Sequence, residues 1–250
     1  MIRFKQVTKR LGGRNVLEDL SFEIKKGEIF TIVGPSGTGK SVTLKHMVRL
    51  LTPTSGSVWI DETEISAANG EELDRVRERF GYLFQGGALL GWISVADNIA
   101  LPLREKTKVS EEEIGQRVAE ALRMVGMEND GDKFPNEISG GMQKRAGLAR
   151  AIVRRPEIVL YDEPTSGLDP VTARTIDQLI KRLNEELGIT SVVVTHDLQG
   201  ALLTADRIAM LTKGRFVEVS DPKTFVASDQ PVVRGFLDAQ FISKNGLAGM

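Results

Sequence analysis

The stretch Gly34-Pro35-Ser36-Gly37-Thr38-Gly39-Lys40-Ser41 decides the fold of this chain. The apolar run 29–33 before it predicts a buried strand, and residues 42–51 after it predict a helix. The loop then wraps a strand-to-helix turn and directs backbone N–H groups and a helix N-terminus at one anion. The glycines let the backbone approach phosphates, Lys40 reaches the β and γ oxygens, and Ser41 can ligate Mg²⁺. A glycine-rich turn with a surface lysine is the alternative, but the strand and helix context favours binding of a nucleoside triphosphate.

The composition suits one large domain, or a core with an inserted subdomain, in 250 residues of which 41% are hydrophobic. A net charge of −1 gives no support for nucleic-acid binding. The absence of cysteine excludes disulfides. The start, Met1-Ile2-Arg3-Phe4-Lys5, lacks the apolar core of a signal peptide, and no stretch of about 18 apolar residues follows. We therefore expect a cytoplasmic chain that does not cross a membrane alone.

Strands alternate with helices along the chain, which indicates an α/β fold. Residues 2–7 and 17–24 alternate apolar and polar positions and predict an antiparallel layer with one solvated face. The turn 53–56 leads into a short strand at 57–60. Further strands are predicted at 158–162, 190–195, 208–212 and 215–219. Between about Gly86 and Pro156 the chain is mostly helical, with Ser110 to Glu113 predicted as a capping box for a helix running to Val125.

Two acids end the apolar run 158–162. A strand of this kind presents its last residues at the carboxyl edge of the sheet, where ligands of open α/β sheets bind. Asp162 is predicted to hold Mg²⁺ and Glu163 to orient and activate the attacking water. The alternative, acids that merely solubilise a strand end, is disfavoured by the phosphate loop in the same chain.

The stretch Ile138-Ser139-Gly140-Gly141-Met142-Gln143-Lys144-Arg145 resembles the signature sequence of ATP-binding cassette (ABC) transporter ATPases. Gln85 after a strand at 81–84, Ser166-Gly167-Leu168-Asp169 after the acids, and His196 after the strand 190–195 match the same family. The resemblance covers residues 2 to about 222. It implies an α/β P-loop NTPase of the ABC type, with an antiparallel β layer and an inserted helical subdomain. The core would be 1–85 and 157–222, the helical subdomain with the signature 86–156, and the C-terminal extension 223–250.

The resemblance also implies the roles of single residues. Ser139, Gly140 and Gly141 would open a helix reaching Arg154 and face the ATP of a second subunit, so that a homodimer encloses two nucleotides. Gln85 would contact Mg²⁺ and the water, and His196 would hydrogen-bond the γ-phosphate. Besides these and the loop 34–41, the expected nucleotide contacts are Leu11, Thr43 and Asp169. The other histidine, His46, is expected to pack inside the molecule.

Two positions depart from the family pattern. Leu11 stands where an aromatic residue usually stacks on adenine, so base stacking is weaker unless Arg10 or Arg14 replaces it. Preference for ATP over GTP is therefore not fixed by the sequence. Met142 replaces the usual glutamine of the signature, while the serine and the backbone donors remain.

The stretches 83–90 and 97–105, residues 41–46, Met142 and the segment from Pro231 to Met250 resemble the ATPases of Mla/Mce-type lipid transporters. That subgroup implies attachment to the cytoplasmic face of the inner membrane through a permease dimer, with an Mce-type lipid-binding protein as a further partner. Residues 88–93, including Trp92, are predicted to receive a permease helix; the alternative is that Trp92 packs inside the insertion. The C-terminal stretch is expected to dock on a partner subunit or to be disordered.

Other functions fit less well. A DNA-repair or chromosome-organising ATPase of the same superfamily needs a long coiled coil, and the insertion is too short and lacks sustained heptads. A non-enzymatic nucleotide-binding module would lack Glu163 and His196. Within transport, the alternatives to lipid are an importer of amino acids, ions or another small solute, and a lipoprotein-release system. The direction of transport does not follow from these motifs.

Overall fold

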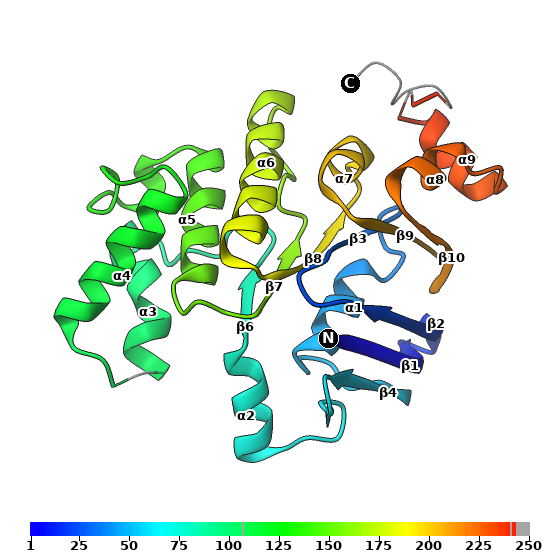
Figure 1. The fold of residues 1–250 in the computed structure, drawn as a ribbon, viewed down its shortest axis with the longest axis horizontal. Coiled ribbons are helices and arrows are strands. Elements are labelled where there is room, and N and C mark those ends of the chain that lie inside the picture. The colour runs from blue at the N-terminus through cyan, green and yellow to red at the C-terminus, as the bar shows by residue number, and fades with distance from the viewer. Residues whose placement is uncertain (107, 241, 244–250) are drawn as a thin grey trace. The chain divides into compact units, whose positions relative to one another are not determined.

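The computed structural model describes residues 1–106, 108–240 and 242–243 (Figure 1). The chain forms two compact units, one of Met1–Arg77 with Thr190–Met250 and the other of Glu78–Ile189. The stretch predicted as the helical subdomain, residues 86–156, lies within the second unit. The boundaries 1–85, 157–222 and 223–250 stay predictions. They divide the chain by the expected function of its parts, whereas the two units are defined by their internal contacts.

The first unit contains an antiparallel sheet in the order β2-β1-β4-β5. Its strands are β1 (Ile2–Leu11), β2 (Arg14–Ile24), β4 (Ser55–Ile60) and β5 (Thr63–Glu64). Ile2 pairs with Ile24 on one side and with Ile60 on the other, and all three side chains are fully buried. This confirms the predicted antiparallel layer, although β1 and β2 are longer than predicted.

A second set of strands in the same unit is mainly parallel. Its strands are β3 (Ile29–Val33), β8 (Thr190–Thr195), β9 (Arg207–Thr212) and β10 (Arg215–Ser220). β3 lies between β8 and β9 and is parallel to both, while β10 is antiparallel to β9. Every residue of β3 and β8 is buried, as expected of central parallel strands, and most of their residues are β-branched or aliphatic. Val33 pairs with Thr195, so the loops that begin at Gly34 and His196 leave neighbouring strands at the same edge.

Four phenylalanines join the two sheets of the first unit. The ring of Phe22 stacks on Phe4 with 4.5 Å between centroids and on Phe30 with 5.6 Å. Phe216 of β10 meets Phe22 edge-on at 4.9 Å. Offset and edge-to-face pairs of this kind add to the burial of the rings, so this cluster fixes β3 against the antiparallel layer.

The helices of the first unit are α1 (Lys40–Met47), α2 (Gly70–Glu78), α7 (Leu198–Thr204), α8 (Pro222–Ala227) and α9 (Pro231–Asp238). The predicted helix 42–51 is wrong at both ends, because α1 begins at Lys40 and stops at Met47. Arg49 has a left-handed backbone, with φ 50°, and the amides of Leu50 and Leu51 turn back to the carbonyl of Lys45. His46 is 1% exposed, as expected of a packing residue.

The second unit contains two parallel strands and four α-helices among its described residues. These are β6 (Phe80–Leu83), β7 (Ile158–Asp162), α3 (Val95–Lys106), α4 (Glu111–Met124), α5 (Gly140–Ile152) and α6 (Pro170–Leu187), with a short 3-10 turn η1 (Pro135–Glu137). Ser110 caps α4 by accepting from the Glu113 amide, but the predicted capping box is incomplete, because the Glu113 side chain pairs with Arg117 instead of bonding back to Ser110. α5 ends two residues before the predicted Arg154, and Arg155 is left-handed at φ 53°.

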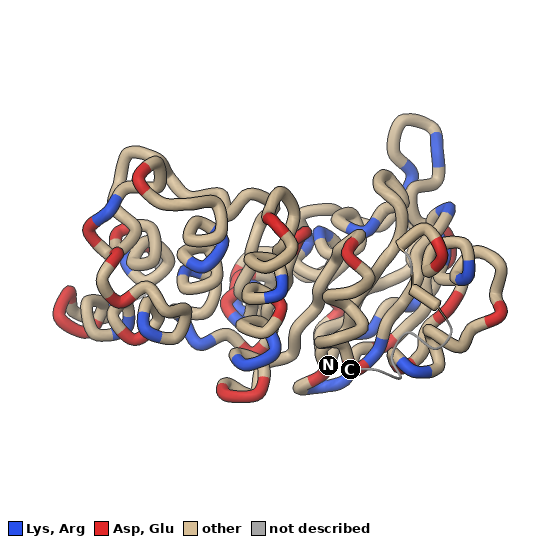
Figure 2. Tube along the Cα trace, turned by 90° about the horizontal axis from the view of Figure 1, so that it is seen from above, with Lys and Arg blue, Asp and Glu red and all other residues tan. Residues whose placement is uncertain are grey.

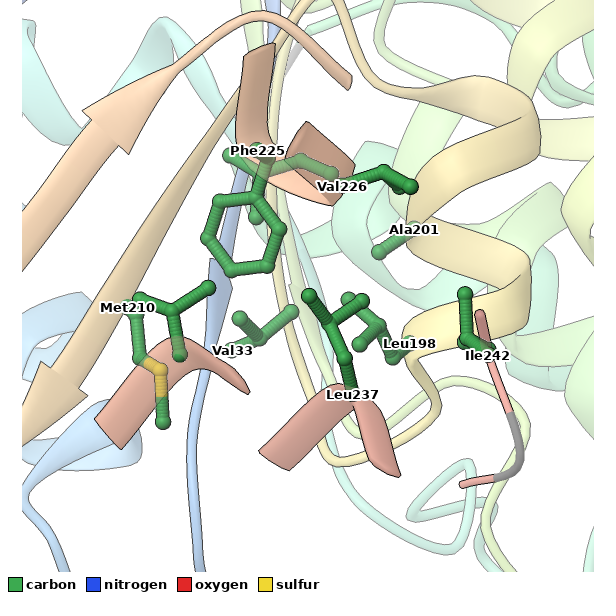
Figure 3. Packing of buried hydrophobic residues seen from close by; sticks show 10 residues of the cluster. Val33, Leu198, Ala201, Met210, Phe225, Val226, Leu237 and Ile242 are labelled. Atoms are coloured by element: carbon green, nitrogen blue, oxygen red, sulfur yellow. The ribbon is translucent and has the colours of Figure 1, made fainter. Parts of the chain in front are cut away.

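The C-terminal segment packs against its own chain. Phe225, Val226, Val233, Leu237 and Ile242 are buried in one cluster with Val33 of β3, with Leu198 and Ala201 of α7, and with Ile208 and Met210 of β9 (Figure 3). The expectation of a disordered tail is therefore wrong for residues 231–240 and 242–243. Docking on a partner subunit stays a prediction, and residues 244–250 lie outside the described residues.

Lys and Arg residues are interspersed with Asp and Glu along the chain, with no long run of one sign (Figure 2). Over residues 1–106, 108–240 and 242–243, no helix has the length and apolar character needed to span a membrane.

Candidate active site

The phosphate loop of the first unit is built around three glycines with positive φ, two of which leave no room for a side chain. Gly34, Gly37 and Gly39 have φ of 150°, 79° and 105°. A Cβ on Gly34 would lie 2.2 Å from the carbonyl oxygen of Leu211, and one on Gly39 would lie 2.8 Å from that of Val16. The backbone therefore turns tightly from β3 into α1, and its amides and the N-terminus of α1 form a cradle that fits the phosphates of ATP.

Lys40 and Thr43 both bond to this loop. Nζ of Lys40 donates to the carbonyl oxygens of Gly34, at 2.8 Å, and Pro35, at 3.2 Å, and the side chain is 6% exposed. Oγ1 of Thr43 donates to the Gly39 carbonyl at 3.1 Å and is fully buried. Lys40 thus brings a positive charge to the loop, and Thr43 braces the loop from inside the helix.

Leu11 lies at the end of β1, before the left-handed pair Gly12 and Gly13. Its side chain is 42% exposed and offers an apolar surface without an aromatic ring. Nη2 of Arg10 donates to the carbonyl oxygen of Gly13 at 3.4 Å, so this guanidinium is directed at its own hairpin. Arg14, at the start of β2, is exposed.

His196 directly follows β8 and is exposed. The loop that carries it is fixed by neighbours. Asp197 donates its amide to Oγ1 of Thr195 at 3.0 Å, and its carboxylate caps α7 by accepting from Gly200. Because Val33 and Thr195 are paired, the structure brings His196 and the phosphate loop to the same edge of the first unit.

The two acids lie at the end of β7 in the second unit. Asp162 is 6% exposed, and the hydroxyl of Tyr82 lies 3.4 Å from its Oδ2. Burial, and then the charge of Asp162, raise the pKa of Tyr82, so its phenol stays protonated and donates to the carboxylate.

Glu163 has a left-handed backbone, with φ 50°. Its carbonyl oxygen accepts from Nζ of Lys144 at 3.3 Å and from Oγ of Ser166 at 3.0 Å. Lys144 lies on α5, is 4% exposed, and has a pKa lowered mainly by burial. A strained residue held by several donors at the end of a buried strand is typical of functional sites.

Gln85 reaches the same edge of the second unit as the acids. Leu83 at the end of β6 pairs with Tyr161, so the residues that follow each strand leave side by side. Gln85 is exposed, and Gly86, Gly87 and Ala88 after it all have positive φ. The guanidinium of Arg150, from α5, donates to the carbonyl oxygens of Gly87 and Ala88 at 2.8 Å each. The loop after Gln85 is therefore tied to the signature helix.

The signature residues begin α5. Ser139 is exposed and caps the helix, accepting from the Met142 amide at 3.3 Å. A Cβ on Gly141 would lie 2.6 Å from Cγ2 of Thr172, so the start of α5 packs directly on the start of α6. Asp169 caps α6; hydrogen bonds from Thr172, and more weakly from the Val171 amide, lower the pKa of the Asp169 carboxyl. The two helix N-termini thus lie together.

Tyr82, Lys144 and Arg150 were missed by sequence reasoning. Each donates a hydrogen bond to a carboxylate or a backbone carbonyl in or next to a motif residue. The sequence does not reveal these partners, because a single lysine or arginine on a helix can pair with many groups. The signal available was their position: Lys144 and Arg150 lie on the helix that begins with the signature, among the small and apolar residues Ala146, Gly147, Leu148, Ala149, Ala151 and Ile152.

The sequence pattern of the ABC transporter family matches residues 17–166. This chain belongs to that family. The probable ribonucleotide transport ATP-binding protein mkl of Mycobacterium leprae is 46% identical over 99% of this chain and 71% of its own length. The intermembrane phospholipid transport system ATP-binding protein MlaF of Haemophilus influenzae is 39% identical over 96% of this chain and 91% of its own. The methionine import ATP-binding protein MetN of Carboxydothermus hydrogenoformans is 42% identical over 89% of this chain and 66% of its own length.

Among solved structures, a dimeric post-hydrolysis state of the ATP-binding cassette MJ0796 bound to ADP and Pi has a TM-score of 0.81 and 38% identity. The match covers 89% of this chain and 99% of that one. The predicted α/β P-loop fold of the ABC type is thereby confirmed, and the chain is an ABC ATPase, the ATP-binding subunit of a transporter. The parts played by its single residues stay predictions.

Proposed function

We propose that this ABC ATPase powers phospholipid transport by hydrolysing ATP beneath a membrane permease. The observation that carries the proposal is the similarity to MlaF, which extends over nearly all of both chains and whose name specifies intermembrane phospholipid transport. The stretches 83–90 and 97–105, which resemble lipid-transporter ATPases, support it from the sequence side.

In this proposal the phosphate loop and Lys40 hold the ATP phosphates and stabilise charge that develops on the leaving oxygens. Glu163 orients and activates the attacking water, and His196 hydrogen-bonds the γ-phosphate. The left-handed backbone of Glu163 supports its role, because strain of this kind persists where the surrounding structure holds it. Leu11 contacts the base through apolar surface alone, so discrimination between ATP and GTP is weak.

The residues present fit Mg²⁺. The described part of the chain holds no cluster of three or more acidic or histidine ligands, so an all-protein cage is excluded there. Mg²⁺ in nucleotide sites instead takes a hydroxyl and one or two carboxylates together with the phosphates. Ser41 carries such a hydroxyl and Asp162 such a carboxylate, and Gln85 carries an amide oxygen; that these residues hold the ion together stays the prediction made from the sequence. When bound, the ion neutralises part of the phosphate charge.

We further propose that two copies of the chain enclose two ATP molecules. The solved cassette MJ0796 is dimeric in its ADP and Pi state. In this chain the exposed Ser139 and the N-terminus of α5 form a second anion-binding end, besides that of α1, which a partner's nucleotide would fill. Gly140 and Gly141 add no side chains of their own at this end.

A surface pocket of the second unit fits a helix of the permease. Its volume is about 410 Å³, and its walls include Tyr82, Phe84, Ala88, Leu101, Pro102 and Arg150. Phe84 is 39% exposed and stacks on Tyr82, so apolar surface is presented at the mouth. Because Ala88 and Arg150 also hold the loop after Gln85, a helix seated here would sense the state of that loop.

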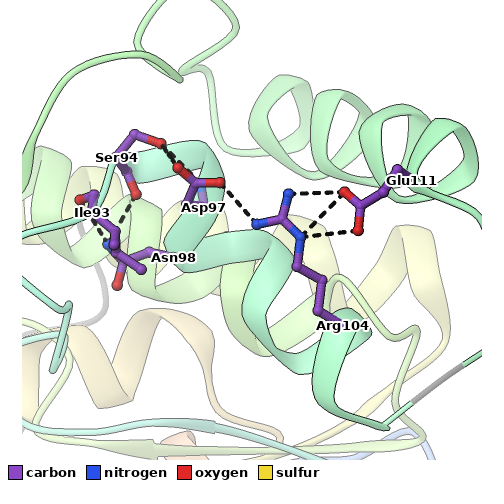
Figure 4. Close-up of polar contacts among 6 residues, drawn as sticks. All are labelled: Ile93, Ser94, Asp97, Asn98, Arg104 and Glu111. Atoms are coloured by element: carbon purple, nitrogen blue, oxygen red, sulfur yellow. Dashed lines mark hydrogen bonds and ion pairs between the residues drawn. The ribbon is translucent and has the colours of Figure 1, made fainter.

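Trp92 belongs to the segment 88–93 that is predicted to receive the permease helix. Its side chain is 76% exposed, so the alternative that it packs inside the insertion is wrong. The segment that carries it is held by Asn98, which is fully buried on α3 (Figure 4). The Asn98 amide accepts from Leu90 N at 2.7 Å and donates to Leu90 O at 3.0 Å and Ser94 O at 2.9 Å. An exposed tryptophan on a segment that hydrogen bonds hold in place is typical of a contact with another protein.

The partners proposed are a permease dimer in the inner membrane and an Mce-type lipid-binding protein, with the ATPase attached to the cytoplasmic face. Two rival cargoes rest on relatives: the mkl protein is named for ribonucleotides and MetN for methionine. Purification of the complex from native membranes, followed by mass spectrometry of its subunits and bound molecules, separates them. Phospholipid with an Mce-domain partner is expected. A soluble binding protein carrying an amino acid or a ribonucleotide as the specific ligand would overturn the lipid cargo.

A further inference from the structure

The carboxamide of Gln240 bonds at both ends to the loop that carries His196. Its Nε2 donates to the carbonyl oxygen of His196 at 3.0 Å, and its Oε1 accepts from the amide of Leu198 at 3.0 Å. A primary amide carries donor and acceptor on one rigid plane. The two bonds therefore fix the peptide groups on either side of Asp197 at the same time.

Gln240 is itself anchored. The backbone amide of Gln240 donates to the carbonyl oxygen of Leu237 at 3.0 Å, and the backbone amide of Ile242 donates to the same oxygen at 3.1 Å. Leu237 is fully buried and Ile242 is 9% exposed, both in the cluster against α7 (Figure 3). Nη2 of Arg234 donates to the carbonyl oxygen of Ile242 at 3.1 Å. The end of the described chain is thus held by apolar burial and by backbone bonds.

His196 is an exposed residue, and its side chain extends from the backbone that these bonds hold. The bonds of Asp197 to Thr195 and Gly200 hold the loop from the strand and the helix. Gln240 holds it from a third side and acts on the carbonyl of His196 itself. A side chain more than 40 residues away in sequence thereby fixes the peptide group of a residue expected to contact phosphate.

We propose that Gln240 is a positioning residue for ATP hydrolysis, which keeps the His196 loop in its active conformation. The inference rests on the proposed contact of His196 with the γ-phosphate. It assigns the segment 222–243 a part in the reaction: hydrolysis depends on α9 and Ile242 being seated on α7, because that seating places Gln240.

Gln240→Ala in the full chain, purified within its membrane complex, tests this. Losing two hydrogen bonds that orient one group should lower kcat by about 3- to 10-fold. KM for ATP should change by less than about twofold, because the phosphate loop still holds the nucleotide. Gln240→Glu should show the same loss, since a carboxylate cannot donate to the His196 carbonyl. Gln199→Ala, an exposed glutamine on the neighbouring α7, is the matched control and should leave kcat unchanged.

The same substitution in a His196→Ala background identifies the route. If Gln240 acts through His196, adding Gln240→Ala should lower kcat no further. An equal loss in both backgrounds would overturn the inference, as would normal kcat in Gln240→Ala beside a strongly impaired His196→Ala. Normal kcat in His196→Ala alone would instead refute the proposed role of His196. A several-degree fall in Tm of Gln240→Ala with a parallel rise in KM would point to general destabilisation, and would also overturn it.

Discussion

Glu163, which is proposed to activate the attacking water, also has a strained backbone. Its carboxylate follows a fully buried strand, and its backbone at φ 50° is disfavoured for a residue with a Cβ. The donors from Lys144 and Ser166 to its carbonyl oxygen hold that conformation. The direction of the carboxylate is therefore determined by groups outside the side chain.

If Glu163 activates the water, Glu163→Gln should lower kcat by roughly 10²-fold or more, the scale of general-base loss. ATP affinity should stay near normal, because the amide is isosteric and the phosphate loop is unchanged, and ATP-bound protein should accumulate. Steady-state ATPase and equilibrium ATP binding measure the two effects. Glu185→Gln, an exposed glutamate on α6, serves as control. ATPase within twofold of the parent would refute the assignment.

The strain predicts a second, separable effect. Glu163→Gly and Glu163→Ala should both abolish rapid hydrolysis, but the glycine variant should have a free energy of unfolding about 1 kcal/mol higher than the alanine variant, because glycine adopts positive φ freely. Urea unfolding compares the two. A glycine variant no more stable than the alanine variant would show that the neighbours of Glu163 store no strain there.

At the scale of an element, α6 carries a buried acid outside the site. Asp177 is 8% exposed and forms an ion pair with Arg174 at 3.0 Å. Burial outweighs the attraction of that arginine and raises the pKa of Asp177 to about 6. A carboxyl with a raised pKa stabilises the fold while it is protonated, and this contribution is lost as the pH rises from the unfolded pKa through the folded one.

The free energy of unfolding should therefore fall more for the parent than for Asp177→Asn as the pH rises. Between about pH 5 and pH 7.5 the free energy of unfolding of the parent should fall by about 1.4 kcal/mol more than that of Asp177→Asn. This is the free-energy equivalent of roughly one pKa unit. Urea unfolding of both proteins at the two pH values measures it, and other titrating groups cancel in the comparison. Parallel pH profiles for the two proteins would show that Asp177 has an ordinary pKa.

The elements also show what the sequence can predict. β3, β7 and β8 match their predicted limits, because continuous β-branched and aliphatic runs between glycine, proline and polar residues leave one interpretation. The end of α1 was mispredicted, since residues 48–51 are apolar enough to continue a helix, and nothing in their sequence marks Arg49 as the left-handed residue after which the Leu50 and Leu51 amides turn back to the Lys45 carbonyl. The tight turn of the phosphate loop could be predicted, because its backbone requirements appear in the sequence as glycines. Lys144, Arg150 and Gln240 were not found, because their partners are distant backbone oxygens.

At the scale of the assembly, the enclosed-dimer proposal requires Ser139 to serve a partner's nucleotide. In a Glu163→Gln background, Lys40→Ala removes a subunit's own phosphate loop and Ser139→Arg blocks the site opposite. A mixture of the two variants should retain ATP, since the mixed dimer contains one complete site, whereas each variant alone should not. Gln116→Arg, exposed on α4, controls for the added charge. If the mixture retains no more ATP than the separate variants, the shared site is wrong.

The last prediction concerns the proposed contact with the permease. Trp92 is 76% exposed on a segment that Asn98 braces, and neither residue is proposed to touch ATP. Trp92→Ala should therefore lower phospholipid transport by the reconstituted complex by about tenfold, the scale of one interfacial hot spot. The ATPase of the free chain should stay within about twofold. Asn98→Ala should act in the same direction, because its loss frees the backbone of Leu90 and Ser94. Phe134→Ala, another exposed aromatic of the second unit, is the control. If Trp92→Ala supports normal transport, or if it lowers free-chain ATPase and transport equally, this surface does not transmit ATP hydrolysis to the permease.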